Sequence, residues 1–193
     1  MDHNLGIIIL AGGHSRRMGE DKGLIEVKGK AIIQYLIETC QIISKNMIII
    51  SNSEHYNVFG YPVYSDIIKN IGPIGGLYTG LHNSVNDWNI VLSCDVPLVS
   101  AQLLRKLAES RNEEKFAGVA AHQERIHPTI GLYHKNFIPT IKNVIKQKQY
   151  KMSNLYEHPK ATIIDCNDFP AKEFLNLNTI NELEFFKKHV NGD

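Results

Sequence analysis

The sequence has 193 residues, of which 43% are hydrophobic and 21% are charged, an ordinary composition for a globular protein. This length suffices to bury a substantial core, so we expect residues 1–193 to form a single domain. Lys and Arg number 21 and Asp and Glu 20, a net charge of +1, so no overall positive field predicts binding to nucleic acid or to a membrane surface.

Cysteine usage and the amino terminus bear on the cellular compartment. The three cysteines are widely spaced and form no CxxC pair, which disfavours a disulfide framework and a structural zinc site: Cys40, Cys94 and Cys166. The amino terminus lacks the basic and long apolar regions of a signal peptide, and no run approaches about 18 apolar residues. We therefore expect a cytoplasmic protein that is neither secreted nor membrane-spanning.

The first predicted strand, Gly6 to Ala11, leads into a loop at residues 10–23 that holds four glycines, two arginines and a lysine. The glycines let backbone N–H groups approach a ligand, and Arg17 and Lys22 can make charge-assisted contacts with phosphates. The loop has neither GxxxxGK[ST] nor GxGxxG spacing. Because the first turn of an open α/β sheet is the usual phosphate site, we predict a polyphosphate ligand; the alternative is a plain turn with solvated charges.

The next predicted elements are a helix from Ala31 to Ile43 and a strand from Met47 to Ser51. The apolar residues of the helix fall on one face, which we expect to pack on the sheet: Ile32, Ile33, Leu36, Ile37, Cys40 and Ile43. Asn52 and Asp66 each lie where a strand is expected to finish, so each can hydrogen-bond a base or a ribose. A glycine-rich turn at residues 72–76 then precedes a short helix.

A buried strand at Ile90 to Ser93 is followed by Cys94 and Asp95. A carboxylate at the carboxyl end of an apolar strand is well placed to hold Mg²⁺, which commonly bridges a carboxylate to substrate phosphates. The alternative is that Asp95 only builds a turn or caps a helix. Cys94 is expected to be a small core residue, because apolar surroundings raise the pKa of a thiol and no histidine is near in the sequence.

The carboxyl-terminal half holds two further predicted strands, Phe116 to Ala121 and Thr129 to Tyr133. His127 is either a strand histidine with satisfied hydrogen bonds or a ligand contact. From Arg125 to Tyr156 there is no Asp or Glu, whereas basic residues accumulate: Arg125, Lys135, Lys142, Lys146, Lys148 and Lys151. This acid-free stretch is either a solvated basic face or a surface for an anionic second substrate.

The last segment contains paired amides and a helix start. Asn176 and Asn178 are two residues apart, so in an extended segment both side chains point the same way, either to build a turn or to contact a ligand. Thr179 and Glu182 form a capping box that predicts the start of a helix.

The alternation of apolar strands with helical segments predicts an α/β fold with a single doubly wound, mainly parallel sheet of the Rossmann-like type. Uninterrupted apolar runs such as IIIL and MIIII indicate strands that are covered on both faces. We therefore expect helices on both faces of the sheet.

Taken together, these motifs closely resemble the molybdenum cofactor guanylyltransferases, within the wider nucleotidyltransferase superfamily. The chain carries, in the order of that family, LAGGHSRRMGEDKGL, GK, ISN, SD, GPIGG, CDVP, HPTIGLY and NLNT. The resemblance runs nearly end to end, and the set is far more specific than any single motif. Departures are few and touch no expected ligand: Ala31 replaces a common proline, and Ile74 and Gly75 replace a common leucine and alanine.

The resemblance implies a division of the chain between two substrates. The amino-terminal half would bind GTP through Leu10, Ala11, Gly12, Gly13, Lys22, Asn52, Asp66 and Asp95. The catalytic residues would be Arg17, Lys22 and Asp95, with the cofactor Mg²⁺ on Asp95. The carboxyl-terminal half would bind molybdopterin through His127, Lys151, Asn176 and Asn178.

The implied reaction is attack by the terminal phosphate of molybdopterin on the α-phosphorus of GTP, with release of pyrophosphate. Other cofactor-biosynthesis proteins and recipient molybdoenzymes are further expected partners. Two alternatives remain at this point: a cytidylyltransferase acting on the same pterin, and a regulator that keeps the nucleotide pocket without turnover. Gly12 favours guanine, because related cytidylyltransferases typically read LAAG where this chain reads LAGG.

Overall fold

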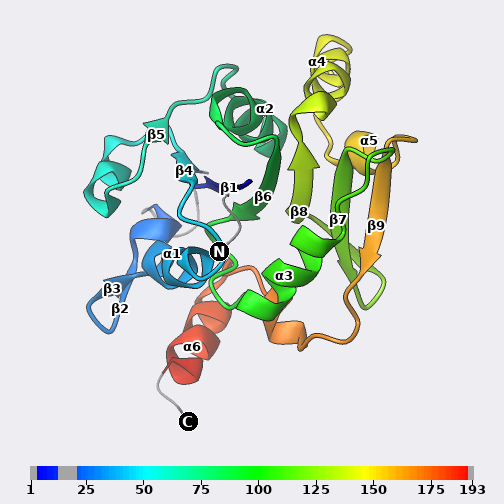
Figure 1. Ribbon diagram of the computed structural model, residues 1–193. Coiled ribbons are helices and arrows are strands. Elements are labelled where there is room, and N and C mark those ends of the chain that lie inside the picture. Colours follow the sequence, from blue (N-terminus) through cyan, green and yellow to red (C-terminus); the bar gives the residue numbers. More distant parts are fainter. Residues whose placement is uncertain (1–3, 13–20, 191–193) are drawn as a thin grey trace.

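The computed structural model describes residues 4–12 and 21–190. Within these ranges the main sheet has seven strands in the order β5-β4-β1-β6-β8-β7-β9 (Figure 1). These strands are β1 Leu5–Leu10, β4 Met47–Ile50, β5 Val63–Tyr64, β6 Trp88–Ser93, β7 Ala117–His122, β8 Arg125–His134 and β9 Ala161–Asp165. A separate hairpin joins β2 Glu26–Val27 to β3 Lys30–Ala31.

Helices pack on both faces of this sheet. The α-helices are α1 Ile32–Gln41, α2 Pro73–Asn83, α3 Ala101–Glu109, α4 Ile138–Lys146, α5 Ser153–Tyr156 and α6 Ile180–His189. Short 3₁₀ helices are η1 Lys22–Leu24, η2 Glu54–Phe59, η3 Lys135–Phe137 and η4 Ala171–Phe174. Among the described residues, no helix combines the length and the apolar character needed to cross a membrane.

Strand direction confirms the predicted doubly wound, mainly parallel α/β fold. β1 pairs in parallel with β4 and β6, β4 with β5, and β7 with β9. β8 alone among these seven strands runs antiparallel to its neighbours, β6 and β7. The five predicted strands are all present, whereas β5 and β9 were not predicted. Hydrophobic periodicity marks a buried strand without giving its direction, so the reversal of β8 was not foreseen either.

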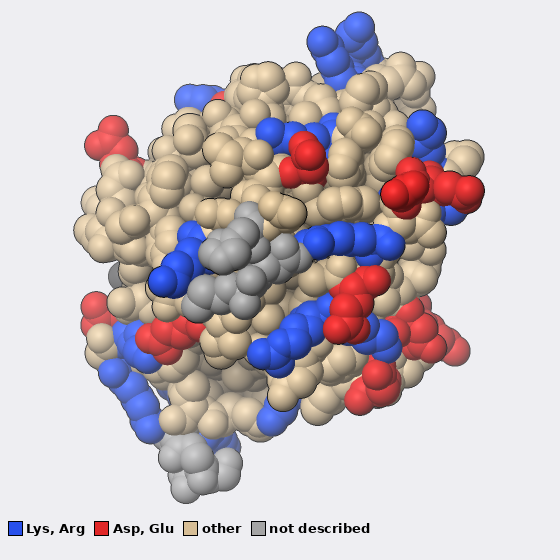
Figure 2. All heavy atoms as spheres, viewed as in Figure 1, with Lys and Arg blue, Asp and Glu red and all other residues tan. Residues whose placement is uncertain are grey.

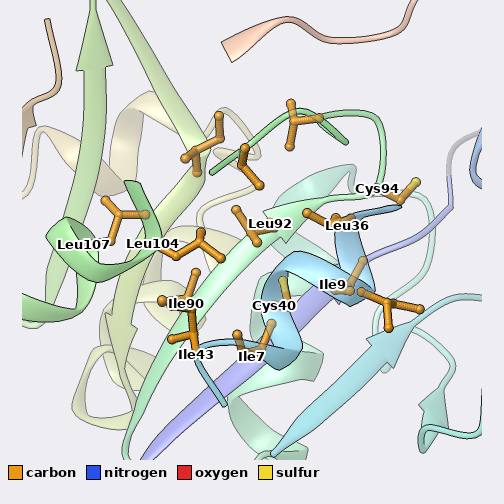
Figure 3. Packing of buried hydrophobic residues seen from close by; sticks show 14 of the residues in the cluster. Ile7, Ile9, Leu36, Cys40, Ile43, Ile90, Leu92, Cys94, Leu104 and Leu107 are labelled. Carbon is orange, nitrogen blue, oxygen red and sulfur yellow. The ribbon is translucent and has the colours of Figure 1, made fainter. Parts of the chain in front are cut away.

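The core has two halves because successive side chains of a strand point to opposite faces. On β1, Ile7 and Ile9 face the half covered by α1 and α3, whereas Ile8 and Leu10 face the half covered by α2 and α4. Burying an isoleucine side chain stabilises the fold by roughly 1.5–3 kcal/mol. Figure 3 shows the first half, where α1 and α3 meet the strands through Leu36, Cys40, Leu104, Leu107, Ile7, Ile9, Ile90 and Leu92.

One residue of the predicted helix face differs from expectation. Ile33, Leu36 and Ile37 of α1 pack toward the sheet as predicted. Ile32 instead packs in a third cluster with Phe186 of α6. Neighbouring helical positions lie about 100° apart, so the start of α1 contacts both the sheet and the last helix.

The carboxyl-terminal helix begins at the predicted capping box. The Thr179 N–H donates to Glu182 Oε2 at 2.7 Å, and the Glu182 N–H donates to Thr179 Oγ1 at 3.3 Å. These bonds satisfy backbone donors that the first turn of a helix leaves free. α6 therefore starts at a defined residue, next to the Asn176 and Asn178 pair.

Helix α2 lies unusually close to β1 because it carries glycine at the contact. A Cβ atom added at Gly80 would stand only 2.4 Å from Ile8 Cγ2, and one added at Gly76 would stand 3.1 Å from Leu10 Cδ2. Any larger side chain would push the helix away from the strand. The glycine-rich motif at residues 72–76 thus belongs to a helix seated tightly on the sheet.

We predict that Gly80→Ala lowers the free energy of unfolding by about 1–2 kcal/mol. Alanine alone would favour a helix by up to about 1 kcal/mol, but overpacking a core contact costs about 1–3 kcal/mol. Urea denaturation of the variant measures the difference. The matched control is His82→Ala at an exposed position of α2, expected within about 0.5 kcal/mol of wild type. An equal or higher stability of Gly80→Ala would contradict the described packing.

Candidate active site

Three of the predicted ligand residues lie where three parallel strands end. β1, β4 and β6 run in register, so the residues that follow them, Gly12, Asn52 and Asp95, come out at one edge of the sheet. Backbone bonds continue the pairing past the strand ends: the Ala11 N–H donates to the Ile50 carbonyl at 2.8 Å. The carboxyl edge of an open α/β sheet is where such folds bind ligands.

Gly12 is required by its backbone conformation. Its φ of +153° lies in a region that residues with a side chain rarely adopt. A Cβ atom placed there would meet nothing closer than Ser51 Oγ at 3.9 Å, so space beside Gly12 is open. The next predicted residues of the loop, Gly13 and Arg17, lie outside the described residues.

Asn52 and Asp66 are hydrogen-bonded to each other. Asn52 Nδ2 donates to Asp66 Oδ2 at 2.8 Å, and the Asp66 N–H donates to Asn52 Oδ1 at 3.2 Å. The pair joins the loops after β4 and β5. A Cβ atom at Gly76 would stand 3.7 Å from Asp66 Oδ1, so the close approach of α2 also bounds this pair. Both residues predicted to contact the nucleoside are therefore presented together.

Asp95 has the character expected of a metal ligand. Its Oδ1 atom is buried and accepts no hydrogen bond from the described residues. A buried acceptor without a partner costs free energy and calls for an explanation such as an ion. Within the described ranges no group of three or more His, Cys, Asp and Glu side chains could hold a metal. The single carboxylate fits Mg²⁺, which proteins often hold by one or two carboxylates plus substrate phosphates.

Lys22 contacts the carboxyl-terminal segment. Its Nζ donates to Asn178 Oδ1 at 2.6 Å, across 156 positions of sequence. Lys22 opens η1, which begins immediately after the Asp21 cap. This bond brings together two predicted residues, one assigned to the GTP phosphates and the other to molybdopterin.

The segment around Asn176 and Asn178 is anchored beside Asp95. The Leu177 N–H donates to the Asp95 carbonyl at 2.8 Å, and the Leu177 side chain is buried with Phe186 of α6. The flanking Asn178 N–H donates to Glu182 Oε2 at 2.7 Å, whereas its side chain accepts the bond from Lys22. Asn178 therefore both builds the turn and reaches the site.

His127 lies at the same edge because β8 runs antiparallel to β6, with Ile130 opposite Leu92, so the start of β8 extends past the carboxyl end of β6. β7 pairs Val119 with Gly131 and then Ala120 with His127, a shift that marks a bulge. The imidazole is 5.1 Å from the Phe174 ring. Burial, followed by the charges of neighbouring His122 and Arg125, lowers the pKa of His127 below its usual range. At neutral pH the ring is therefore uncharged, and suited to a hydrogen bond or a ring contact with a ligand.

The acid-free stretch is divided between the two edges of the sheet. Arg125 begins β8 and Lys135 follows its end, so the two lie at opposite edges. Lys151 is exposed just before α5; its carbonyl accepts the Asn154 N–H at 3.1 Å, and among the described residues no hydrogen bond or ion pair holds its side chain. Figure 2 shows Lys and Arg interspersed with Asp and Glu over the face in view.

A hollow of about 540 Å³ lies near the start of β6, at the opposite edge from Asp95. Its lining includes Trp88, Phe116 and His134, whose rings pack on each other at 4.7 and 5.6 Å. None of the predicted ligand residues lines it. The strand ends and the buried oxygen of Asp95 make the carboxyl edge the candidate site instead.

Sequence reasoning missed Tyr56 and Asp21, which are hydrogen-bonded to each other below the site. Tyr56 is fully buried in η2, and Asp21 caps η1. A local sequence pattern does not predict a contact between residues that are 35 positions apart. The one available signal was that Asp21 directly precedes Lys22.

The chain is similar in sequence to known proteins over most of its length. The family model of the MobA-like NTP transferase domain matches residues 7–162. A probable molybdenum cofactor guanylyltransferase from Flavobacterium johnsoniae is 34% identical over 179 residues, covering 93% of this chain and 94% of the relative. A molybdenum cofactor guanylyltransferase from Photobacterium profundum is 33% identical over 183 residues, covering 93% of both chains.

A solved structure shares the fold. The molybdopterin-guanine dinucleotide biosynthesis protein A from Archaeoglobus fulgidus superposes with a TM-score of 0.83, covering 97% of this chain and 100% of that one. Its sequence identity is 19%, so this likeness concerns the fold alone.

We predict that Cys94 is unreactive in the folded protein. Burial, with smaller contributions from the Asp95 and Asp21 carboxylates, raises the pKa of its thiol to about 12. At pH 8 such a thiol is ionised in about one molecule in 10,000, against about a quarter for an ordinary cysteine. Iodoacetamide labelling followed by peptide mass spectrometry should show modification of Cys94 only after unfolding in urea. Rapid labelling of the native protein would contradict the described burial.

Proposed function

The chain belongs to the MobA-like NTP transferase family. We propose that it transfers GMP from GTP to the terminal phosphate of molybdenum-molybdopterin. The products are the molybdopterin guanine dinucleotide cofactor and pyrophosphate. The observation that carries this proposal is the buried, unpaired Oδ1 atom of Asp95 among the described residues, at the edge where β1, β4 and β6 end. Relatives that are named as guanylyltransferases favour guanine over the cytidylyltransferase alternative.

Nucleotide binding falls to the amino-terminal half. Gly12 leaves open space at the end of β1, and the Asn52–Asp66 pair offers an amide and a carboxylate to the nucleoside. Lys22 and Arg17 supply positive charges for the phosphates, and Gly13 of the same loop offers its backbone N–H. Leu10 is the last residue of β1 and Ala11 is the first residue after it. Both would line the bottom of this nucleotide pocket.

Mg²⁺, held by Asp95 and the phosphates, would supply positive charge to the α-phosphate and the leaving pyrophosphate. The chain's own residues position two anionic reactants for an in-line displacement, in which one P–O bond forms as another breaks. Lys22 offsets the charge that develops on the leaving group. The attacking phosphate oxygen is already ionised at neutral pH, so no general base is needed and none of the buried cysteines acts as a nucleophile.

The second substrate lies on the other side of Asp95. Sheet order places β8 next to β6, so His127 is on the side away from Asn52. Asn176 and Asn178 approach the same side through the Leu177 contact with Asp95. We assign these three residues to molybdopterin, and Lys151 contributes a charge from its exposed position before α5.

We also propose a domain organisation, a cellular compartment and protein partners for this chain. Residues 1–193 act as one nucleotidyltransferase domain, with GTP held mainly by the amino-terminal half and molybdopterin by the carboxyl-terminal half. The three cysteines are free thiols, which suits a reducing cytoplasm. Other cofactor-biosynthesis proteins and recipient molybdoenzymes are the proposed protein partners.

Purified protein incubated with molybdopterin, Mg²⁺ and one nucleoside triphosphate at a time should release pyrophosphate with GTP. We expect at least a tenfold lower rate with CTP, ATP or UTP. Omission of Mg²⁺, or addition of EDTA, should stop the release. A preference for CTP would replace this proposal with the cytidylyltransferase, and GTP binding without any release would leave a nucleotide-binding regulator.

We predict that Asp95→Ala abolishes magnesium-dependent transfer while the protein stays folded. The substitution removes the carboxylate that holds the metal, and it also removes a buried unpaired oxygen, so stability should not fall greatly. Pyrophosphate release and thermal melting measure the two effects. The matched control is Asp87→Ala, at the opposite end of β6, which should keep wild-type activity. Undiminished transfer by Asp95→Ala would contradict the assignment.

A further inference from the structure

Tyr56 connects the segment after β4, which carries Asn52, to the turn that carries Lys22. It lies in η2, four residues after Asn52, and its side chain is fully buried. Its hydroxyl donates a hydrogen bond to Asp21 Oδ1. A hydroxyl buried without a partner costs free energy, so a tyrosine at such a position depends on the partner it reaches.

Asp21 transmits this contact to the turn that carries Lys22. Its carboxylate accepts the Gly23 N–H at 3.4 Å, and its carbonyl accepts the Leu24 N–H at 2.9 Å. Lys22 stands between these bonded positions. The conformation of its backbone is therefore set by the residue that Tyr56 holds.

The space around this contact is closed. A Cβ atom at Gly23 would stand 2.5 Å from Tyr56 Oη and 3.3 Å from Cys94 Sγ. The turn at Gly23 therefore packs closely against the Tyr56 hydroxyl and against Cys94 after β6. Cys94 directly precedes Asp95, so the turn that carries Lys22 packs beside the segment that carries Asp95.

We propose that Tyr56 is a positioning residue for nucleotidyl transfer: through Asp21 its hydroxyl holds Lys22 at the same edge of the sheet as Asp95 before GTP binds. This inference rests on the proposed function for the identity of the nucleotide. It adds a residue outside the family motifs on which the site was predicted. Tyr56 does not touch the substrates and acts through the turn.

The test is Tyr56→Phe, which removes one oxygen atom from the core. The variant is made in the wild type and in a Lys22→Ala background, and GTP affinity by calorimetry and pyrophosphate release are measured for all four proteins. In the wild type we expect GTP affinity and kcat/KM to fall about tenfold. In the Lys22→Ala background the same change should cost less than twofold, because residues that act as one unit are not additive.

The matched control is Tyr61→Phe, which removes a hydroxyl whose partner is the exposed Gln41 side chain at 2.6 Å. It should leave affinity and rate unchanged. Thermal melting of each variant checks folding, and the double-mutant comparison separates a loss of positioning from a general loss of stability, which would lower both backgrounds equally.

The outcomes divide cleanly. Equal losses in both backgrounds, or no loss in the wild type, would overturn the role of Tyr56 even if GTP is the substrate. A wild-type protein that binds GTP without releasing pyrophosphate would overturn the proposed reaction, and the affinity measurements would still decide the role of Tyr56. A wild-type protein that binds no GTP would overturn both.

Discussion

The parallel pairing of β1 with β4 on one side and with β6 on the other decides where Gly12, Asn52 and Asp95 lie. The register sets Leu10 beside Ile50 and Ser93, so three chain segments leave the sheet at the same level. Uninterrupted apolar strands that are covered on both faces make this register costly to shift, because a slip would bury the polar residues that follow the strands. The glycines of α2 keep the covering helix close enough to bound the site.

The order of strands along that edge agrees with the proposal that one site binds two anionic substrates. Asp66 and Asn52 follow β5 and β4, Asp95 follows β6 in the middle, and His127 lies on β8 beyond it. The segment around Leu177 is hydrogen-bonded to Asp95, and its residue Asn178 contacts Lys22. In the proposed function, a Mg²⁺ ion on Asp95 would lie between the two substrates and would lower the repulsion between their phosphates.

Several candidate site residues could be proposed from the sequence because their chemistry and their local position coincide. Asp95 directly follows an apolar strand, and Asn52 does the same, so strand ends alone indicated both. Gly12 was also predicted, and the structure adds a second reason for a glycine there: its backbone dihedral favours glycine, while the neighbouring space is open. Tyr56 gave no such sign, because its importance lies in a contact with Asp21 that only the folded chain creates.

The sequence by itself determined the α/β class, the approximate strands and helices, and the family motifs, because hydrophobic periodicity and turn chemistry are local properties of the chain. Tertiary structure alone decided the direction of β8, the contact of Ile32 with α6 and the bond between Lys22 and Asn178. Each of these joins segments far apart in the sequence, and such pairings depend on how complete elements pack, which no local pattern encodes.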